Sequence, residues 1–566
     1  MKIFKYIFTV FLTCLILPAN ASKGLKYAPV HKNKIIKPVT ANKIINKTAI
    51  KENKVASKPE TYNMFQQHLD IFNCINFNEL KELSQNNKPQ GELFNKVGYV
   101  LNNAAVDNSI SDISNYEYKN DEKIGNYIRV ASWNIQRGFN LNQIKQSFAD
   151  PESLFSTLVN PEKGILKSAE AQQQILKDSD IIILNEVDAG MPRTGYINVV
   201  KELASSLKYN YAYGVEFLEV DPVHLGLEDY KWSEERFLYP NIKKIEINEE
   251  KYKGLHGSAI LSRFPLENVR IIRLPKVYDW YNGEKGRISD LEDVKRGAAN
   301  VVFDEEMFRE IRIGGRMAIA ADIKTPGLDT PVTIIATHFE NRCIPKFREQ
   351  QLRYLLQYMY NIRNPIVLAG DFNTTGRDGS PTGIRKELKK RLKDPEFLAR
   401  TAISVAVPYA SIANAVAQVT NIARTHTDPT VKNIPILAVN REREFFDIIR
   451  KEKFEDGHCF DIRGISDKTS NYREGLLADS NERDFKGFKP TFIFKRPLVI
   501  GKYKLDWFFV KAYLNEQNSP KGSYKLAPHY GRTLFDLNYI FPVPISDHAP
   551  VTVDLPINEP AALLDK

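Results

Sequence analysis

Two patterns of hydrophobic and polar residues divide the chain at about Tyr127. Before this point, residues 60–126 carry apolar residues at helical spacing, for instance over 64–77 and 93–101, with polar breaks between them. After it, short runs rich in β-branched and aromatic residues recur, separated by longer stretches with helical spacing. The pattern predicts a small helical prefix with a polar connector, followed by a large domain in which strands and helices alternate.

The predicted strands of the large domain are short and mostly apolar. They lie at 128–135, 181–187, 258–261, 319–323, 332–336, 366–369, 505–510 and 551–555. Helical spacing is found between several of them, at 168–177, 197–207 and 346–360. Strands that alternate with helices are typical of an α/β architecture, in which helices cover a core of sheets. We therefore expect the α/β fold class.

Two regions interrupt this alternation. Residues 219–255 are polar and aromatic with little periodicity, and we expect a long surface loop there. Residues 376–500 are too many for a strand connection, so they are expected to form an insertion with structure of its own. The insertion begins with a basic helix at 384–393 and continues with an apolar stretch at 397–423. One interpretation is a helical subdomain that packs on the core, and the other is an element that contacts lipid or controls substrate access.

The first 21 residues have the pattern of a secretory signal peptide. A lysine-bearing start precedes an apolar run over 7–17, and Ala-Asn-Ala at 19–21 supplies the small residues that signal peptidase recognises. We expect cleavage after Ala21 and a mature protein that is secreted or periplasmic. The apolar run is too short to span a membrane and no later run is longer, so the mature chain is expected to have no transmembrane span.

The formal net charge of +10 is concentrated just after the signal peptide. Residues 22–59 hold ten lysines and one acidic residue, Glu52, whereas the rest of the mature chain is close to neutral. Because few large apolar residues accompany these lysines, we expect a disordered linker. The alternative is a basic tail that contacts anionic surfaces or polymers. The net charge therefore says little about the surface of the folded domain.

Polar side chains stand at or next to one end of six of the predicted strands. Because strand ends share the edge of a sheet, residues from distant parts of the chain can meet there. Carboxylate, amide and imidazole groups are the groups that cation binding and acid–base chemistry use. Turn formation explains one such residue but not six. The residues are Asn134, Asn185 with Glu186, His338, Asp371 with Asn373, Asp506, and Asp547 with His548.

The motifs around these residues, read in order, resemble those of the endonuclease/exonuclease/phosphatase superfamily. This group includes DNase I-like nucleases, neutral sphingomyelinases and inositol polyphosphate phosphatases. The motifs are WNIQRG, ILNEVD, GSAILSRFP, ATHFENR, VLAGDFN, KLDWFFV and SDHAPV. A catalytic domain is therefore expected over 127–556, with a short tail at 557–566. The resemblance implies a four-layer sandwich with two central mixed β-sheets flanked by helices, and hydrolysis of phosphoester bonds with Mg²⁺ or Mn²⁺.

The resemblance also implies roles for individual residues. Glu186 stands at the position of the family's metal carboxylate, and Asp547 and Asn134 would share the coordination shell or its waters. His548 would be the general base or a phosphate contact, and Asp506 would accept its other ring proton and so fix the tautomer. One departure concerns Gln136, which stands where the repair-nuclease branch has a metal-binding Asp, so a second metal position is in question.

Further roles are implied for residues of the other motifs. Asp371 would orient or deprotonate the attacking water, and Asn373 would hydrogen-bond the phosphate. His338 resembles the second histidine of the DNase I-like and sphingomyelinase-like branches, which can protonate the leaving oxygen. Arg316 resembles an arginine that precedes an equivalent strand in several branches, where either a phosphate contact or a structural ion pair is expected. Glu216 is a candidate for orienting His338.

These features together predict a secreted, metal-dependent phosphoesterase with nucleic acid as the leading substrate class. The apolar stretch of the insertion and the nearly neutral body leave open a sphingomyelinase-like lipid phosphodiesterase, and an inositol-phosphate phosphatase is a further alternative. An alternative of another class is a non-catalytic protein that binds polyanions with the same fold and the basic tail. The complete set of predicted catalytic residues argues against this last interpretation.

Overall fold

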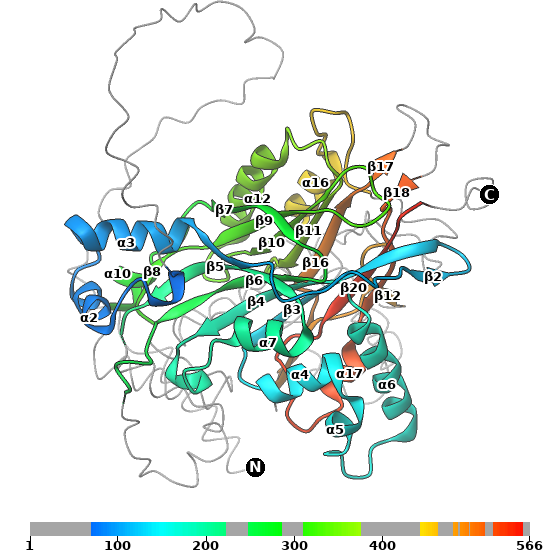
Figure 1. Cartoon of the computed structure of the whole chain (residues 1–566), viewed down its shortest axis with the longest axis horizontal. Coiled ribbons are helices and arrows are strands. Elements are labelled where there is room, and N and C mark those ends of the chain that lie inside the picture. The colour runs from blue at the N-terminus through cyan, green and yellow to red at the C-terminus, as the bar shows by residue number, and fades with distance from the viewer. Residues whose placement is uncertain are drawn as a thin grey trace, which may run out of the picture. The chain divides into compact units, whose positions relative to one another are not determined.

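Two mixed β-sheets form the centre of the fold (Figure 1). In the computed structural model of the protein, the described residues are 70–221, 247–285, 310–374, 442–461, 479–484, 487–496, 499–514 and 524–558. All of them belong to the second of two units, which spans His68–Lys566. The predicted signal peptide, the lysine-rich linker, the basic helix at 384–393 and the apolar stretch at 397–423 lie outside the described residues.

The larger sheet has nine strands and the smaller one has five. The larger sheet pairs β1 (Ala104–Asp107), β5 (Asn210–Glu219), β6 (Leu255–Ser262), β4 (Ile181–Ala189), β3 (Gly125–Arg137), β20 (Val551–Pro556) and β19 (His529–Thr533), with β2 (Lys119–Asp121) beside β3 and β8 (Arg312–Gly314) beside β5. The smaller sheet pairs β16 (Asp506–Lys511), β11 (Ile366–Asp371), β10 (Val332–His338), β9 (Met317–Ile323) and β7 (Leu266–Arg273). In each sheet one pair is parallel, β3 with β4 and β10 with β11, so both sheets are mixed.

The sheets pack face to face because their strands are apolar on both sides. In β4, Ile181 and Ile183 belong to the apolar core between the sheets, whereas Ile182 and Leu184 belong to the core under the outer helices. Helices α4 (Leu141–Ala149), α5 (Pro151–Phe155), α6 (Lys163–Lys177), α7 (Val199–Leu207) and α17 (Phe535–Tyr539) cover the larger sheet (Figure 1). Helices α12 (Pro345–Met359) and α16 (Arg443–Lys451) cover the smaller one. The predicted four-layer α/β sandwich is confirmed.

All eight predicted strands and the three predicted helices of the large domain are present within a few residues of the expected bounds. The sequence pattern missed β5, a long strand next to β6 in the larger sheet. All ten of its residues are buried, so it lacks the alternation of apolar and polar residues that marks a half-exposed strand.

The prefix joins the larger sheet directly. It contains η2 (Ile71–Asn73), α2 (Phe77–Gln85) and α3 (Gly91–Asn102). The predicted helix at 93–101 is confirmed by α3, whereas the described part of 64–77 holds only the short η2 before α2 begins. Asn76 and Glu79 form a capping box that begins α2. The connector, expected to be only polar, carries β2, and β1 pairs antiparallel with β5. The prefix is therefore part of the same folded body as the catalytic motifs.

The described part of the insertion contains strands as well as a helix. Phe445 and Phe446 of α16 pack with α12 in the core beneath the smaller sheet. The short strands β12 (Arg483–Asp484), β13 (Gly487–Phe488), β14 (Phe492–Arg496) and β15 (Val499–Tyr503) were not predicted. The remaining short elements are η3 (Pro192–Thr194), α10 (Trp280–Lys285), β17 (Tyr513–Leu514) and β18 (Tyr524–Lys525). Within the described ranges, no helix combines the length and the apolar character that crossing a membrane requires.

Candidate active site

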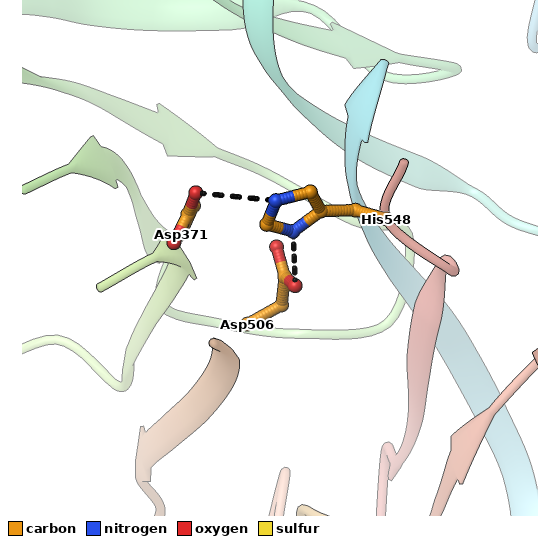
Figure 2. A group of neighbouring side chains, drawn as sticks. All are labelled: Asp371, Asp506 and His548. Carbon is orange, nitrogen blue, oxygen red and sulfur yellow. Dashed lines mark hydrogen bonds and ion pairs between the residues drawn. The ribbon is translucent and has the colours of Figure 1, made fainter. Parts of the chain in front are cut away.

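Three of the predicted site residues face one another across neighbouring strands of the smaller sheet. His338 ends β10, Asp371 ends β11, and Asp506 begins β16. The strand register pairs Asp371 with His338 on one side and with Asp506 on the other. His548, which precedes β20 of the larger sheet, reaches the same place (Figure 2). The predicted meeting of strand ends is confirmed for these four residues.

His548 and Asp506 form a buried imidazole–carboxylate pair. Nδ1 of His548 lies 2.8 Å from Oδ2 of Asp506, and its Nε2 lies 3.8 Å from Oδ2 of Asp371 (Figure 2). Trp133 donates a hydrogen bond of 2.7 Å from Nε1 to the carbonyl of His548, which fixes the backbone at this point. Because Asp506 accepts from Nδ1, the imidazole presents Nε2 to Asp371.

The site concentrates negative charge around His548. Burial alone lowers the pKa of His548, but the carboxylates of Asp506, Asp547 and Asp371 raise it well above its ordinary value. Burial also raises the pKa of Asp371; His548 opposes this rise and Asp506 adds to it. Burial is the main cause that raises the pKa of Asp547 to about 6, a rise that His548 opposes and that Glu186 and Asp371 increase. A divalent cation would compensate these crowded carboxylates.

One carboxylate oxygen of Asp371 is the centre of the site. Its Oδ2 lies 3.6 Å from Nε2 of His338 and 3.2 Å from Nδ2 of Asn134, in addition to facing His548. Its Oδ1 accepts a hydrogen bond of 2.9 Å from the backbone N–H of Asn373, whose side-chain amide donates to the carbonyl of Phe339. The carboxylate is thus held in place while Oδ2 is surrounded by nitrogen atoms.

An irregular stretch of backbone places Glu186. The pairing of β4 with both β3 and β6 shifts around this residue, and its φ is 53°. Gln136 and Arg137 on the neighbouring β3 also have positive φ values of 48° and 65°. Positive φ is uncommon outside glycine, and bulges beside active sites redirect side chains. Here the bulge brings Oε1 of Glu186 to 3.3 Å from Nδ2 of Asn134, close to Asp371.

The donor set of the site fits a divalent cation. Mg²⁺ and Mn²⁺ prefer oxygen ligands, which Glu186 and Asp547 supply as carboxylates. Oδ1 of Asp506 is buried and has no hydrogen-bond partner among the described residues. Ligand atoms of Asp371, Asp506 and His548 lie within 4.8 Å of one another, although Nδ1 of His548 is already bound to Asp506. The carboxylates therefore suit a cation, and its specific ligands stay a prediction.

Asn134 lies between Glu186 and Asp371, and its predicted place in the coordination shell or beside its waters stays a prediction. Its Nδ2 donates to Glu186 and Asp371, and its Oδ1 accepts a hydrogen bond of 3.0 Å from the backbone N–H of Gln136. Ser546 donates from Oγ to the carbonyl of Asn134, which links this residue to the loop that carries Asp547 and His548. In this arrangement the amide of Asn134 bridges two carboxylates.

Asn185 is a site residue whose role the sequence analysis did not identify. It is fully buried, accepts a hydrogen bond of 2.9 Å from the backbone N–H of Asp371, and donates to the carbonyl of Thr337 at 3.1 Å and to Oγ of Ser258 at 3.0 Å. It therefore joins β4 of the larger sheet to β10 and β11 of the smaller one. Gly370, with φ +140°, permits this approach because a Cβ there would collide with the Thr337 carbonyl. A buried amide after an apolar strand was the available signal.

Arg316 is engaged with protein groups beside His338. Its Nη1 lies 2.8 Å from Oε2 of Glu216 and 2.7 Å from Nδ1 of His338. Burial by itself raises the pKa of Glu216, but the neighbouring His338 and Arg316 hold it well below its ordinary value. The structure thus contains the ion pair that was one of the two interpretations of Arg316. Glu216 lies 3.5 Å from Nδ1 of His338, close to the residue that it was expected to orient.

Comparison with known proteins places this site in a family. A sequence model of the Endonuclease/Exonuclease/phosphatase family matches residues 131–548. No curated protein matches the chain. Similar solved structures include an endonuclease/exonuclease/phosphatase from Beutenbergia cavernae DSM 12333, with 14% identity over 76% of this chain and 72% of that chain and a TM-score of 0.32. A second is the human Nocturnin catalytic domain with bound sulfate, with 14% identity over 76% of this chain and 94% of that chain and a TM-score of 0.32. A third is ANGEL2, a 2′,3′-cyclic phosphatase, with 16% identity over 78% of this chain and 97% of that chain and a TM-score of 0.30.

The family match covers most of the chain and includes every predicted site residue, from Asn134 to His548. The described residues of that range form the four-layer sandwich and bring the strand ends together. The chain therefore belongs to the endonuclease/exonuclease/phosphatase family.

Proposed function

We propose that this protein hydrolyses phosphodiester bonds by attack of water, with Mg²⁺ or Mn²⁺ bound beside Glu186, and that nucleic acid is its substrate class. The observation that carries the proposal is the convergence on Oδ2 of Asp371. Nε2 of His338 at 3.6 Å, Nε2 of His548 at 3.8 Å and Nδ2 of Asn134 at 3.2 Å all face this oxygen. An acceptor surrounded by donors in a buried site can hold a water and a phosphate next to each other.

The proposed catalytic role of each residue follows from its charge and its pKa. Asp371 orients the attacking water and accepts its proton, because burial raises its pKa and makes it a stronger base than an exposed aspartate. His548, whose pKa is raised by Asp506 and the other carboxylates, donates from Nε2 to a non-bridging phosphate oxygen. His338 donates a hydrogen bond to the leaving oxygen. The cation, when bound, supplies Lewis-acid stabilisation of the charged phosphate oxygens.

Nucleic acid is the first substrate class to test because the ordered motifs resemble a superfamily that includes DNase I-like nucleases. The motif that contains His338 resembles the sphingomyelinase-like branch as well, so it does not separate nucleic acid from lipid. The sequence feature that favours a lipid, the apolar stretch at 397–423, lies outside the described residues. No contact in the described part of the chain therefore distinguishes a lipid phosphodiesterase or an inositol-phosphate phosphatase from a nuclease.

A parallel assay tests the reaction and the substrate class together. The chain from Ser22 onward is incubated with Mg²⁺, with Mn²⁺ or with EDTA against plasmid DNA, RNA, sphingomyelin and inositol phosphates. We expect cation-dependent cleavage of nucleic acid that is lost in His548→Gln and Asp371→Asn. The matched control is His529→Gln, since His529 is also a buried histidine but lies in β19 away from the four meeting residues.

Each outcome of this assay has a definite meaning. Turnover of sphingomyelin or inositol phosphates without nucleic acid would overturn the proposed substrate class. Full activity in His548→Gln or in EDTA would overturn the proposed chemistry. Absence of turnover with every substrate would favour the non-catalytic protein that binds polyanions.

We also propose that the chain is exported and that its basic segment, residues 22–59, contacts anionic surfaces. Mass spectrometry of the exported protein should find Ser22 at its N-terminus, and retention of Met1 would contradict the signal peptide. Removal of residues 22–58 should weaken adsorption to anionic vesicles or DNA and leave the kinetics on a small soluble phosphodiester nearly unchanged. A large fall in that rate would mean that this segment belongs to the catalytic site.

A further inference from the structure

The ring nitrogen of His338 that faces away from the site is bound by an arginine. Nη1 of Arg316 lies 2.7 Å from Nδ1 of His338, a normal hydrogen-bond distance. The carboxylate of Glu216, expected to orient this imidazole, lies 3.5 Å from Nδ1 and instead binds Nη1 of Arg316 at 2.8 Å. The arginine therefore stands between the histidine and its nearest carboxylate.

This contact determines where the imidazole proton lies. A guanidinium has donors only, so Nδ1 of His338 must be the acceptor in a hydrogen bond with Arg316. The proton of the neutral imidazole is then on Nε2, which faces Oδ2 of Asp371 at 3.6 Å. An imidazolium would place its Nδ1–H against an N–H of Arg316, with two positive charges at the same contact. The observed geometry thus favours the neutral ring.

Arg316 is held firmly enough to impose this choice. It is buried, and its partner Glu216 accepts a second hydrogen bond of 2.6 Å from Oγ of Ser258. Ser258 in turn accepts from Asn185, which also binds the backbone N–H of Asp371. The side chain of Arg316 lies 5.3 Å from the ring of Phe217, a cation–π distance. The hydrogen bonds therefore form a chain that runs from His338 through Arg316, Glu216, Ser258 and Asn185 to the backbone of Asp371.

We propose that Arg316 is a positioning residue that holds His338 as the neutral tautomer with its proton on Nε2. The catalytic consequence rests on the proposed function, whereas the tautomer is a property of the protein by itself. A neutral imidazole that gave up its only proton would become an imidazolate, so His338 keeps the proton and donates a hydrogen bond to the leaving oxygen. The leaving oxygen takes its proton from solvent. His338 is thus a neutral donor and not an imidazolium acid, a role that a histidine can have in an enzyme.

Nitrogen NMR of the protein labelled with ¹⁵N-histidine tests the tautomer without any substrate. The ring signals of His338 are assigned by their loss in His338→Asn. At neutral pH we expect a protonated Nε2 and a bare Nδ1. A protonated Nδ1, or protonation of both nitrogens, would overturn the proposal.

Substitutions of Arg316 test the positioning. In Arg316→Met, the ring proton should move from Nε2 to Nδ1, which then faces the carboxylate of Glu216. The bare Nε2 can no longer donate to the leaving oxygen, so kcat should fall on the order of 10²-fold with a much smaller change in KM. Arg316→Lys retains a donor, so it should keep the Nε2–H signature and recover a large part of kcat. If Arg316→Met does not fold, the native spectrum and the lysine variant decide the question.

The matched control is Arg312→Met. Arg312 is buried and also lies 5.3 Å from the ring of Phe217, but its ion pairs are with Glu219 and Glu310. Its loss should lower stability and leave the His338 ring signals unchanged; an equal change in both variants would overturn the specific role of Arg316.

An Nε2–H signature in a protein that hydrolyses no phosphodiester would overturn the proposed function alone, and turnover with an Nδ1–H signature would overturn this inference alone.

Discussion

Replacement of Asn185 by leucine should separate the positioning of Asp371 from general stability. Asn185 is fully buried and makes three hydrogen bonds. Those to the Asp371 N–H and the Thr337 carbonyl connect the two sheets, and the third goes to Oγ of Ser258 within the larger sheet. Leucine has nearly the same size and shape but no polar atom. The change therefore removes the hydrogen bonds and leaves the apolar packing nearly as it was.

The expected loss of stability in Asn185→Leu follows from the two backbone groups that lose a hydrogen-bond partner. The Asp371 N–H loses its side-chain acceptor, and the Thr337 carbonyl loses a donor in a region without solvent. A buried polar group left unsatisfied costs about 1–3 kcal/mol, so the free energy of unfolding should fall by about 2–6 kcal/mol. Asp371 should also shift relative to His338 and His548, and a small misplacement of catalytic groups can lower kcat on the order of 10²-fold.

The assay compares Asn185→Leu with Asn210→Leu. Asn210 is also buried in the larger sheet, and its Oδ1 accepts hydrogen bonds from the backbone of Ile110 at 3.2 Å and Ser111 at 3.0 Å, away from the site. Urea denaturation should show a loss of stability in both variants. Only Asn185→Leu should lose kcat on a phosphodiester substrate at a temperature where both remain folded.

Two results would refute this reasoning. A folded Asn185→Leu protein with the kcat of the unchanged protein would show that Asn185 does not position Asp371. An equal loss of kcat in Asn210→Leu would show that activity follows stability and not the contact between the sheets.

Three other substitutions have definite expected outcomes. Asp506→Asn should lower kcat by about 10²–10⁴-fold with the protein still folded, because His548 loses its charged partner, and a nearly unchanged kcat would contradict that role. Lys504→Met should raise stability at pH 7 by about 3 kcal/mol, because burial lowers the pKa of Lys504 to about 8 from 10.5. Below pH 8 the lysine is charged in the folded and the unfolded state, and burying that charge lowers the stability of the folded state. Between pH 8 and 10.5 the lysine loses its proton in the folded state but keeps it in the unfolded state, so the stability of the unchanged protein should rise with pH. Urea midpoints measured at each pH should show this rise in the unchanged protein and not in the variant. Gly370→Ala should destabilise the protein by about 4 kcal/mol or more, because its Cβ would meet the Thr337 carbonyl at a positive φ, and a soluble variant with an unchanged melting temperature would contradict this.

The sequence by itself determined the order of the elements and the residues at the strand ends. Alternating and continuous apolar runs predicted four of the nine strands of the larger sheet and four of the five strands of the smaller one, because the inward and outward faces of a strand follow a period of two. Asp371 could be identified because it stands where an apolar run ends, and Asp506 because it stands at the start of one. The fully buried strand β5 was missed because its polar residues, Asn210, Glu216 and Glu219, do not alternate regularly with its apolar ones.

Only the tertiary structure decided which atoms face one another. Asn185 and Asp371 are 186 positions apart, and their hydrogen bond depends on how the two sheets stack. The same stacking puts Arg316, and not Glu216, at Nδ1 of His338, a difference of 2.7 Å against 3.5 Å that no local pattern contains. The reason is that a buried polar group takes whichever partner the register and packing bring within reach, and these depend on the whole chain. The sequence therefore predicts which residues meet, and the fold decides which tautomer and which charge each one presents.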